Sequence, residues 1–416
     1  MAYLVFLKAR LRSIGSRRIV AVLVLAGTLC AVVVFDVVSV TRERYAVREC
    51  ATISDQEDRF QCWFDIIRDY IKQDEIERAF RVFKYTYDTQ PIFAETGCHI
   101  HAHKVGDMQY YERYRERATS FDELRFPQET TTCGYGFYHG FFEHLVQENP
   151  TASFISDTCA YFGERLGGSM ASIVSTCFHG SGHGLMLAEG LKHGKSDWGK
   201  AEAYTRPALL ICDSLRNARD FDMRECREGV YNVLVNWMAG NEYGFTLKPN
   251  RLFDVCKNIT RPEWKKACYY ELSQKLDTPS ESNITKLQKI VRDIPETELR
   301  YLAFSVGVNS IMQSRVGDGE YAEIVAQCDA LTDVEYKKRC VQSVVAGLFE
   351  HGSTQEEYKP AFTLCRTYQG DLAKACWQTT GGRLARFYGL RRAKELCADV
   401  PVEFQEICFS TARDSI

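Results

Sequence analysis

The sequence predicts an all-α protein, in which a solenoid-like array of disulfide-stapled helical-hairpin repeats follows an N-terminal transmembrane helix. Three observations lead to this fold class: an uncharged apolar run near the N-terminus, a large set of cysteines after it, and apolar residues at helical spacing between the cysteines. The 416 residues are 45% hydrophobic and 12% aromatic, enough for one or two substantial cores.

The N-terminal segment has the features of a membrane anchor. Residues 19–35 carry no charge and are dominated by Val, Leu and Ala, close to the shortest run that crosses a bilayer as a helix. The basic residues before this run, with no acidic residue among them, are Lys8, Arg10, Arg12, Arg17 and Arg18. Basic residues next to a transmembrane helix stay on the cytoplasmic side of the membrane. We therefore assign residues 1–18 to a cytoplasmic tail and 19–40 to a transmembrane signal anchor.

This topology makes the chain a single-pass membrane protein whose main domain is extracytoplasmic: periplasmic, extracellular or lumenal. A cleaved signal peptide is the alternative, but its apolar region is usually shorter and ends in an Ala-x-Ala pattern, which residues 37–41 lack. The net charge is −3, and subtracting the five basic charges of the tail leaves −8 for the rest of the chain. We therefore expect no nucleic-acid partner.

The cysteines predict a disulfide framework. Cys30 lies within the anchor, and the other 16 of the 17 cysteines lie beyond it, where disulfides form and persist. Six close pairs recur along the chain: Cys50/Cys62, Cys212/Cys226, Cys256/Cys268, Cys328/Cys340, Cys365/Cys376 and Cys397/Cys408. For the remaining four we favour the bridges Cys98/Cys133 and Cys159/Cys177, although thiolate ligation of a metal is an alternative. Connectivity does not follow rigorously from spacing, and Cys98/Cys133 is the weaker inference.

A helix start is expected inside the cysteine intervals. Capping-box patterns, in which a hydroxyl and a carboxylate satisfy free backbone amides, occur at Ser54/Glu57, Thr260/Glu263 and Thr332/Glu335. Apolar residues follow at helical spacing, so each interval predicts two antiparallel helices pinned by a bridge. We divide the exported part into a helical domain with a His-rich module (43–200) and disulfide-linked hairpin repeats (201–416). Asn258 and Asn283 lie in glycosylation sequons whose use depends on the host.

The histidines give the main functional indication. Eight of nine lie between His99 and His193, in three stretches that each begin with a cysteine. Residues four apart share one face of a helix. The candidate metal ligands that this spacing places together are His99, His103, Asp107, His139, Glu143, His179 and His183. Imidazole and carboxylate on facing helices suit a transition metal (Zn, Cu, Fe or Mn), and the set is large enough for two ions.

Other chemistry remains open. No metalloprotease motif or covalent haem motif is present, but non-covalent haem ligation by these histidines is an alternative. The competing interpretation is that the histidines are structural, with His101, His144, His193 and His351 as structural or supporting residues. We therefore predict a membrane-anchored extracytoplasmic protein with a His-rich metal centre, and leave open whether it is an enzyme. The alternative function is a membrane-tethered scaffold that binds an extracytoplasmic protein partner, since stacked helical repeats form extended concave surfaces.

Overall fold

The computed structural model describes residues 40–95, 97–116, 120–131, 133–166, 172–316, 321–353 and 356–415. Over these ranges the chain is helical, with no strand. No helix within them has the length and apolar character needed to span a bilayer. The anchor predicted at residues 19–40 lies outside the described residues except for residue 40, where a helix over residues 40–51 is already present.

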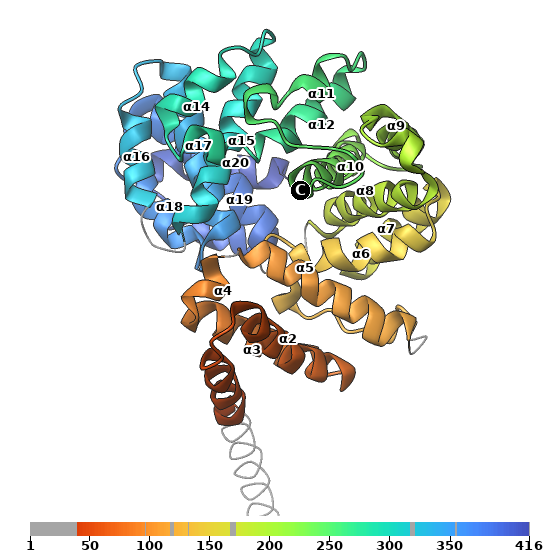
Figure 1. The fold of residues 1–416 in the computed structure, drawn as a ribbon. Helices are drawn as coiled ribbons and strands as arrows, with labels where there is room; N and C mark the ends of the chain where they lie inside the picture. Colours follow the sequence, from red (N-terminus) through yellow and green to blue (C-terminus); the bar gives the residue numbers. More distant parts are fainter. Residues whose placement is uncertain are drawn as a thin grey trace, which may run out of the picture.

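The helices are mostly short, and a few longer ones pack against several neighbours (Figure 1). In chain order they are α2 (Gln56–Lys72), α3 (Ile76–Thr89), α4 (Pro91–Glu95), α5 (Cys98–Gln109), α6 (Gly136–Glu148), α7 (Ala152–Leu166), α8 (Ile173–Lys192), α9 (Ala201–Asp213), α10 (Asp220–Gly240), α11 (Asp254–Lys257), α12 (Pro262–Ser273), α13 (Asp277–Ser280), α14 (Ile284–Val291), α15 (Thr297–Val316), α16 (Tyr321–Asp329), α17 (Val334–His351), α18 (Tyr358–Cys365), α19 (Gly370–Cys397) and α20 (Val402–Asp414). A π-helical turn, η1 (Tyr110–Arg115), continues α5, and three 3₁₀ turns are η2 (Gln128–Thr131), η3 (Lys195–Asp197) and η4 (Pro249–Arg251).

All eight predicted bridges are present, including the less certain Cys98–Cys133 bridge. Five of them join a helix to the longer helix that follows it: α7 to α8, α9 to α10, α11 to α12, α16 to α17, and α18 to α19. Each bridge therefore fixes two helices that also pack against each other.

The helices α14 and α15 pack against each other without a bridge. The segment from Val291 to Ala303 has the same spacing as a bridged interval, and both residues are fully buried, at the end of α14 and within α15. Apolar packing takes the place of the sulfur link there.

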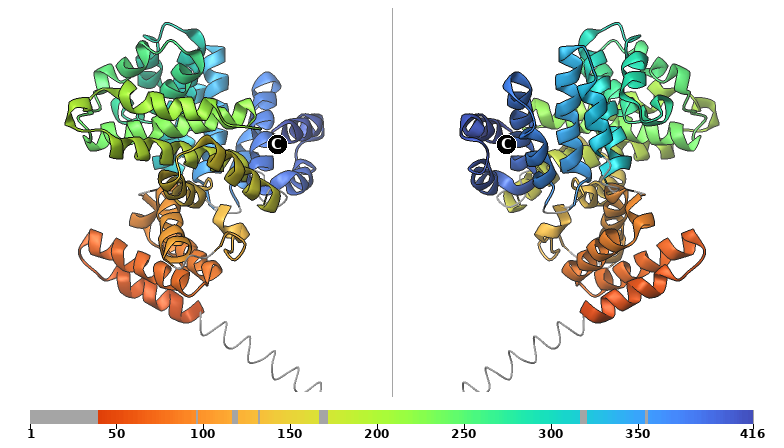
Figure 2. Two further views of the ribbon diagram at one scale, coloured as in Figure 1. Left: turned by 90° about the vertical axis from the view of Figure 1, so that its right-hand side faces the viewer. Right: turned by 90° about the vertical axis from the view of Figure 1, so that its left-hand side faces the viewer.

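The longer helices pack in succession around an arc. Contacts run from α5 to α6, α8, α10, α12, α15, α17, α19 and α20 (Figure 1). The helix over residues 40–51, α2 and α3 project from one side of this arc (Figure 2). The far end of the arc returns to its start, because the Tyr135 hydroxyl donates to the carbonyl oxygen of Arg386 on α19 at 3.2 Å.

The helix starts lie within the cysteine intervals, but the capping residues differ from the prediction by one position. Asp55 caps α2 and accepts from the Asp58 amide, and Asp333 caps α17 and accepts from the Glu335 and Tyr336 amides. The helix α12 begins after Arg261 rather than Thr260. The prediction that Ser54, Thr260 and Thr332 cap was wrong; at α2 and α17 an aspartate carboxylate, which also favours the positive end of the helix, does so instead.

Candidate metal centre

The three histidine-bearing stretches are helical, as their spacing predicts. His99, His103 and Asp107 lie on α5, His139 and Glu143 on α6, and His179 and His183 on α8. The helix α6 packs against both α5 and α8, so it is the middle of three adjacent helices (Figure 1). Side chains from all three helices can therefore meet at one place.

Glycines bring these helices unusually close together. A Cβ atom on Gly140 of α6 would lie 2.2 Å from the His103 carbonyl oxygen, and one on Gly184 of α8 would lie 2.4 Å from the Glu143 carbonyl oxygen. Any larger residue at either position would push the helices apart. The glycines among the histidines thus set the distances across the site.

Three of the seven predicted ligands converge: His103, Glu143 and His183. One ligand atom from each lies within 4.8 Å of the others. The Glu143 Oε2 atom is 3.2 Å from His103 Nε2 and 3.0 Å from His183 Nδ1, so the carboxylate stands between two imidazoles. Within the described residues, no other group of three His, Cys, Asp or Glu side chains meets in this way.

Asp107 supports the site from one side rather than joining it. Its Oδ1 atom lies 3.5 Å from His103 Nδ1 and 3.4 Å from His144 Nε2, while the Tyr111 hydroxyl is 3.1 Å from His144 Nδ1. A carboxylate on Nδ1 fixes the ring of a ligating histidine and leaves Nε2 for the metal. Tyr111 belongs to η1, and π-helical turns are frequent at functional sites.

The electrostatics of the three groups are strongly coupled. Burial lowers the pKa of His103, but Asp107 and Glu143 outweigh it and raise the value to about 10. Burial also opposes ionisation of Glu143, yet the two imidazoles hold its pKa well below the usual range. Burial lowers the pKa of His183 to about 4, despite the hydrogen bond with Glu143. Without an ion, the carboxylate is therefore neutralised mainly by His103.

One atom of the triad is buried without a hydrogen-bond partner. His183 Nε2 is buried and makes no hydrogen bond. Leaving a buried polar atom unpaired costs free energy, and a metal ion is one group that would use a free imidazole nitrogen. This orphan atom, together with the two-histidine, one-carboxylate donor set, fits a transition-metal ion.

The other three predicted histidine ligands lie near the site but outside the triad. His139 Nδ1 and His99 Nε2 are 3.0 Å apart, and His99 Nδ1 donates to the Cys133 carbonyl oxygen at 2.9 Å. His179 Nδ1 instead faces Glu225 Oε2 of α10 at 3.7 Å. The rings of His99, His139 and His179 also lie side by side, with centroids 4.8 and 4.7 Å apart. Among the described residues, however, only His103, Glu143 and His183 form a group of three whose ligand atoms all lie within 4.8 Å of one another.

Sequence reasoning missed Glu225. It lies on the next hairpin, 42 positions after His183, and no histidine-like spacing marks it. It directly precedes Cys226, whose bridge joins α10 to α9, and the packing of α10 against α8 brings it to His179.

The histidines assigned supporting roles behave accordingly. His101 Nε2 bonds the Phe93 carbonyl oxygen at 2.8 Å, and its ring stacks on Phe93 with centroids 3.8 Å apart. His193 pairs with Asp197 at 3.1 Å. His144 contacts Asp107 as described above.

No family model, curated protein or solved structure matches this chain. The chemistry of the site has to be inferred from its own residues.

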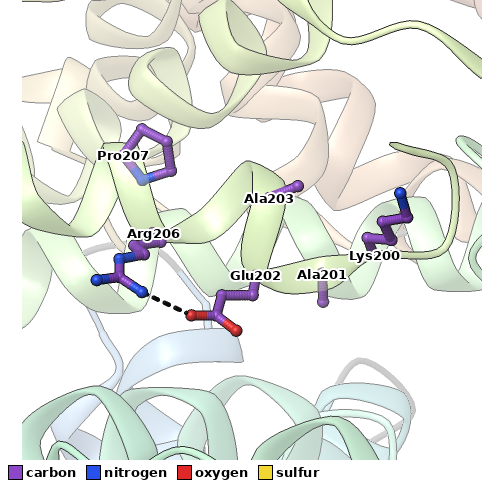
Figure 3. Close-up of a pocket in the computed structure, with 6 residues that line it drawn as sticks. All are labelled: Lys200, Ala201, Glu202, Ala203, Arg206 and Pro207. Atoms are coloured by element: carbon purple, nitrogen blue, oxygen red, sulfur yellow. Dashed lines mark hydrogen bonds and ion pairs between the residues drawn. The ribbon is translucent and has the colours of Figure 1, made fainter. Parts of the chain in front are cut away.

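Two surface hollows are lined by described residues outside the triad. The larger, of about 630 Å³, is open and runs along α9 from Lys200 to Pro207, where Glu202 pairs with Arg206 at 3.0 Å (Figure 3). It contains no histidine. The smaller, of about 240 Å³, is lined by Tyr111, Arg115, His144, Gln147, Glu148 and Leu191. Because His144 contacts Asp107, this second hollow is the one that adjoins the metal-ligand cluster.

Proposed function

We propose that the protein is a membrane-anchored, extracytoplasmic helical repeat protein that binds a transition-metal ion at His103, Glu143 and His183. The observation that carries this proposal is the convergence of these three side chains from three helices, with ligand atoms within 4.8 Å. Two imidazoles and one carboxylate are the donor set of many catalytic zinc sites and of non-haem iron sites. Three protein ligands leave coordination positions open for a small ligand.

The surroundings favour a small ion over haem. Glu143 lies directly between the two imidazoles, so a porphyrin has no place between them. A bound ion would use His183 Nε2 or Nδ1 and His103 Nε2, while Asp107 holds the opposite nitrogen of His103. With an open position the ion would polarise water or another small ligand, and Glu143 or Asp107 is placed to accept a proton.

The membrane part of the proposal rests on the sequence of residues 1–40 and agrees with the eight bridges, which are typical of exported proteins. In cells or vesicles whose extracytoplasmic face is open to the solution, added protease should digest the domain beyond residue 40 and spare a tag at the N-terminus. Digestion of the N-terminal tag alone would contradict the topology. The sequon residue Asn258 is exposed, whereas Asn283 caps α14.

A second function, a membrane-tethered scaffold with structural histidines, is favoured by one observation. Both imidazoles already contact Glu143, and a proton held by His103 would neutralise that carboxylate without any ion. In that case the arc of helices would serve to bind an extracytoplasmic protein.

Metal analysis of the full-length chain, purified in detergent and dialysed against metal-free buffer, separates the two functions. We expect about one transition-metal ion per chain, with large losses in His103→Ala and His183→Ala. His193→Ala is the matched control, because His193 also has a carboxylate partner but lies outside the triad. Metal-free wild-type protein with no haem absorption band, after preparation with and without oxygen, would refute the metal centre and leave the scaffold.

A further inference from the structure

Arg386 is a half-buried cation without a counter-ion. Its guanidinium lies over the ring of Phe221 on α10, 5.0 Å from the centroid. In the part of the chain that the structure describes, this guanidinium makes no hydrogen bond and no ion pair. A partly desolvated guanidinium usually has a carboxylate or another oxyanion as its partner, because leaving the charge unpaired costs free energy.

The backbone of Arg386 is held firmly in place. Its carbonyl oxygen accepts hydrogen bonds from the Tyr135 hydroxyl at 3.2 Å and the Ser172 hydroxyl at 3.4 Å. These residues directly precede the histidine helices α6 and α8. The structure therefore fixes Arg386 at the junction between α19 and the histidine helices.

Two further arginines lie around the same place. Arg224 also packs on Phe221, at 4.4 Å, so one phenyl ring has two guanidinium groups on it. Arg383 lies one turn before Arg386 on α19. Burial lowers the pKa of Arg386, and the like charges of Arg383 and Arg224 lower it further while Glu225 and Glu350 oppose them.

The nearby carboxylates are already engaged. Glu225 pairs with Arg224 at 3.3 Å and faces His179, and Glu350 pairs with Arg383 and accepts from Asn309. Glu228 lies 3.5 Å from Arg224, and burial raises its pKa well above the usual range, so it contributes little negative charge. One positive charge is thus left over among the three arginines.

The arginines are connected to the metal centre by a short series of side chains. Glu225, beside Arg224, faces His179 at 3.7 Å, and the rings of His179 and His183 have centroids 4.9 Å apart. These contacts link Arg224 through Glu225 and His179 to His183 of the triad.

We propose that Arg386, with Arg383 and Arg224 beside it, binds the oxyanion group of a small-molecule ligand, a carboxylate or a phosphate. A planar guanidinium can hold either group through two parallel hydrogen bonds. That this ligand is the substrate or co-ligand of the metal ion rests on the proposed function. The oxyanion site itself does not.

Calorimetric titration of the full-length chain in detergent tests the site, with inorganic phosphate and succinate as probes at constant ionic strength. We expect saturable binding of at least one probe, weakened about tenfold or more in Arg386→Gln, because a charged hydrogen bond to the oxyanion is lost. Arg386→Lys should restore part of the affinity. Arg391→Gln is the matched control, because Arg391 is exposed and lies beyond the break in α19 at Gly389. The stronger of the two probes indicates whether the natural ligand carries a carboxylate or a phosphate.

Absence of saturable binding of both probes by wild type would overturn the proposal, as would equal affinities in Arg386→Gln and Arg391→Gln. If Arg386→Gln does not fold, as judged by circular dichroism, the wild type and Arg386→Lys still decide. Metal content is measured on the same samples. Bound anion without metal would refute the proposed function alone, and bound metal without anion would refute the oxyanion site alone.

Discussion

Gly140→Ala tests whether the close approach of α5 and α6 positions the metal centre. The new Cβ would lie 2.2 Å from the His103 carbonyl oxygen, whereas such contacts essentially never fall below 3.0 Å. The helices must therefore separate by about 0.8 Å, the difference between these distances. Metal sites tolerate about 0.2 Å in ligand distance, so His103 would move out of reach of the ion.

The effect on stability can be worked out in the same way. Forcing a methyl group against rigid backbone costs about 3 kcal/mol, and replacing glycine inside a helix returns about 1 kcal/mol. We expect Gly140→Ala to lower the free energy of unfolding by about 2 kcal/mol. Gly194→Ala is the matched control, because no atom lies within 4 Å of its added Cβ; it should change stability by less than about 1 kcal/mol.

Urea unfolding of the oxidised, metal-free protein, followed by circular dichroism, measures the stability difference, and elemental analysis measures the metal content. Gly140→Ala should lose both stability and metal, and Gly194→Ala neither. If Gly140→Ala unfolds at the same urea concentration as Gly194→Ala and keeps its metal, the glycines do not set the geometry of the site.

Three further predictions follow from buried charges and bridges. Asp107 and Glu143 outweigh burial and raise the pKa of His103 to about 10. The ion pairs of His103 therefore stabilise the fold fully below the unfolded-state pKa of about 6.5, and this stabilisation is lost as the pH rises through 10. Thermal melting of the metal-free wild type should show this loss at alkaline pH, and His103→Gln should not. Burial raises the pKa of Glu271 to about 7, so the free energy of unfolding of wild type falls by up to about 3 kcal/mol between pH 4.5 and 7. The melting temperature of Glu271→Gln should therefore rise further above that of wild type as the pH increases through this range. A difference that stays constant would contradict this. Replacing Cys98 and Cys133 by serine should lower the free energy of unfolding by about 4 kcal/mol, and replacing Cys50 and Cys62 should lower it by about 3 kcal/mol, because the two bridges close loops of 35 and 12 residues. Equal urea midpoints of the two variants would contradict the dependence on loop length.

The sequence was sufficient for the features that depend on local spacing. The cysteines pair consecutively along the chain. Short separations led to six of the bridges, and the expectation of an oxidising compartment favoured Cys98–Cys133 and Cys159–Cys177 for the remaining four cysteines. Residues four apart on a helix share a face, which placed His103 beside Asp107 and His179 beside His183. The helix starts were located to within one residue for the same reason.

The sequence did not predict the features that depend on how the helices cross. Glu143, rather than Asp107, stands between the two imidazoles because α6 lies between α5 and α8, and no spacing within one helix contains that information. Arg386 lies 194 positions after Lys192, the last residue of α8, and reaches the histidine helices only because α19 returns to Tyr135. Such contacts follow from the path of the whole arc.

The strict pairing of consecutive cysteines has a consequence for biogenesis. As the polypeptide emerges from its N-terminal end, each cysteine that awaits a partner meets the correct one next, after at most 35 residues. If the domain is exported as we propose, oxidation can thus proceed hairpin by hairpin, with little need for an isomerase to correct mistakes. Chemical denaturation with full reduction removes this order, because the sixteen bridge-forming thiols then compete at once. Yields of native protein should be far lower from that state than from synthesis in the cell.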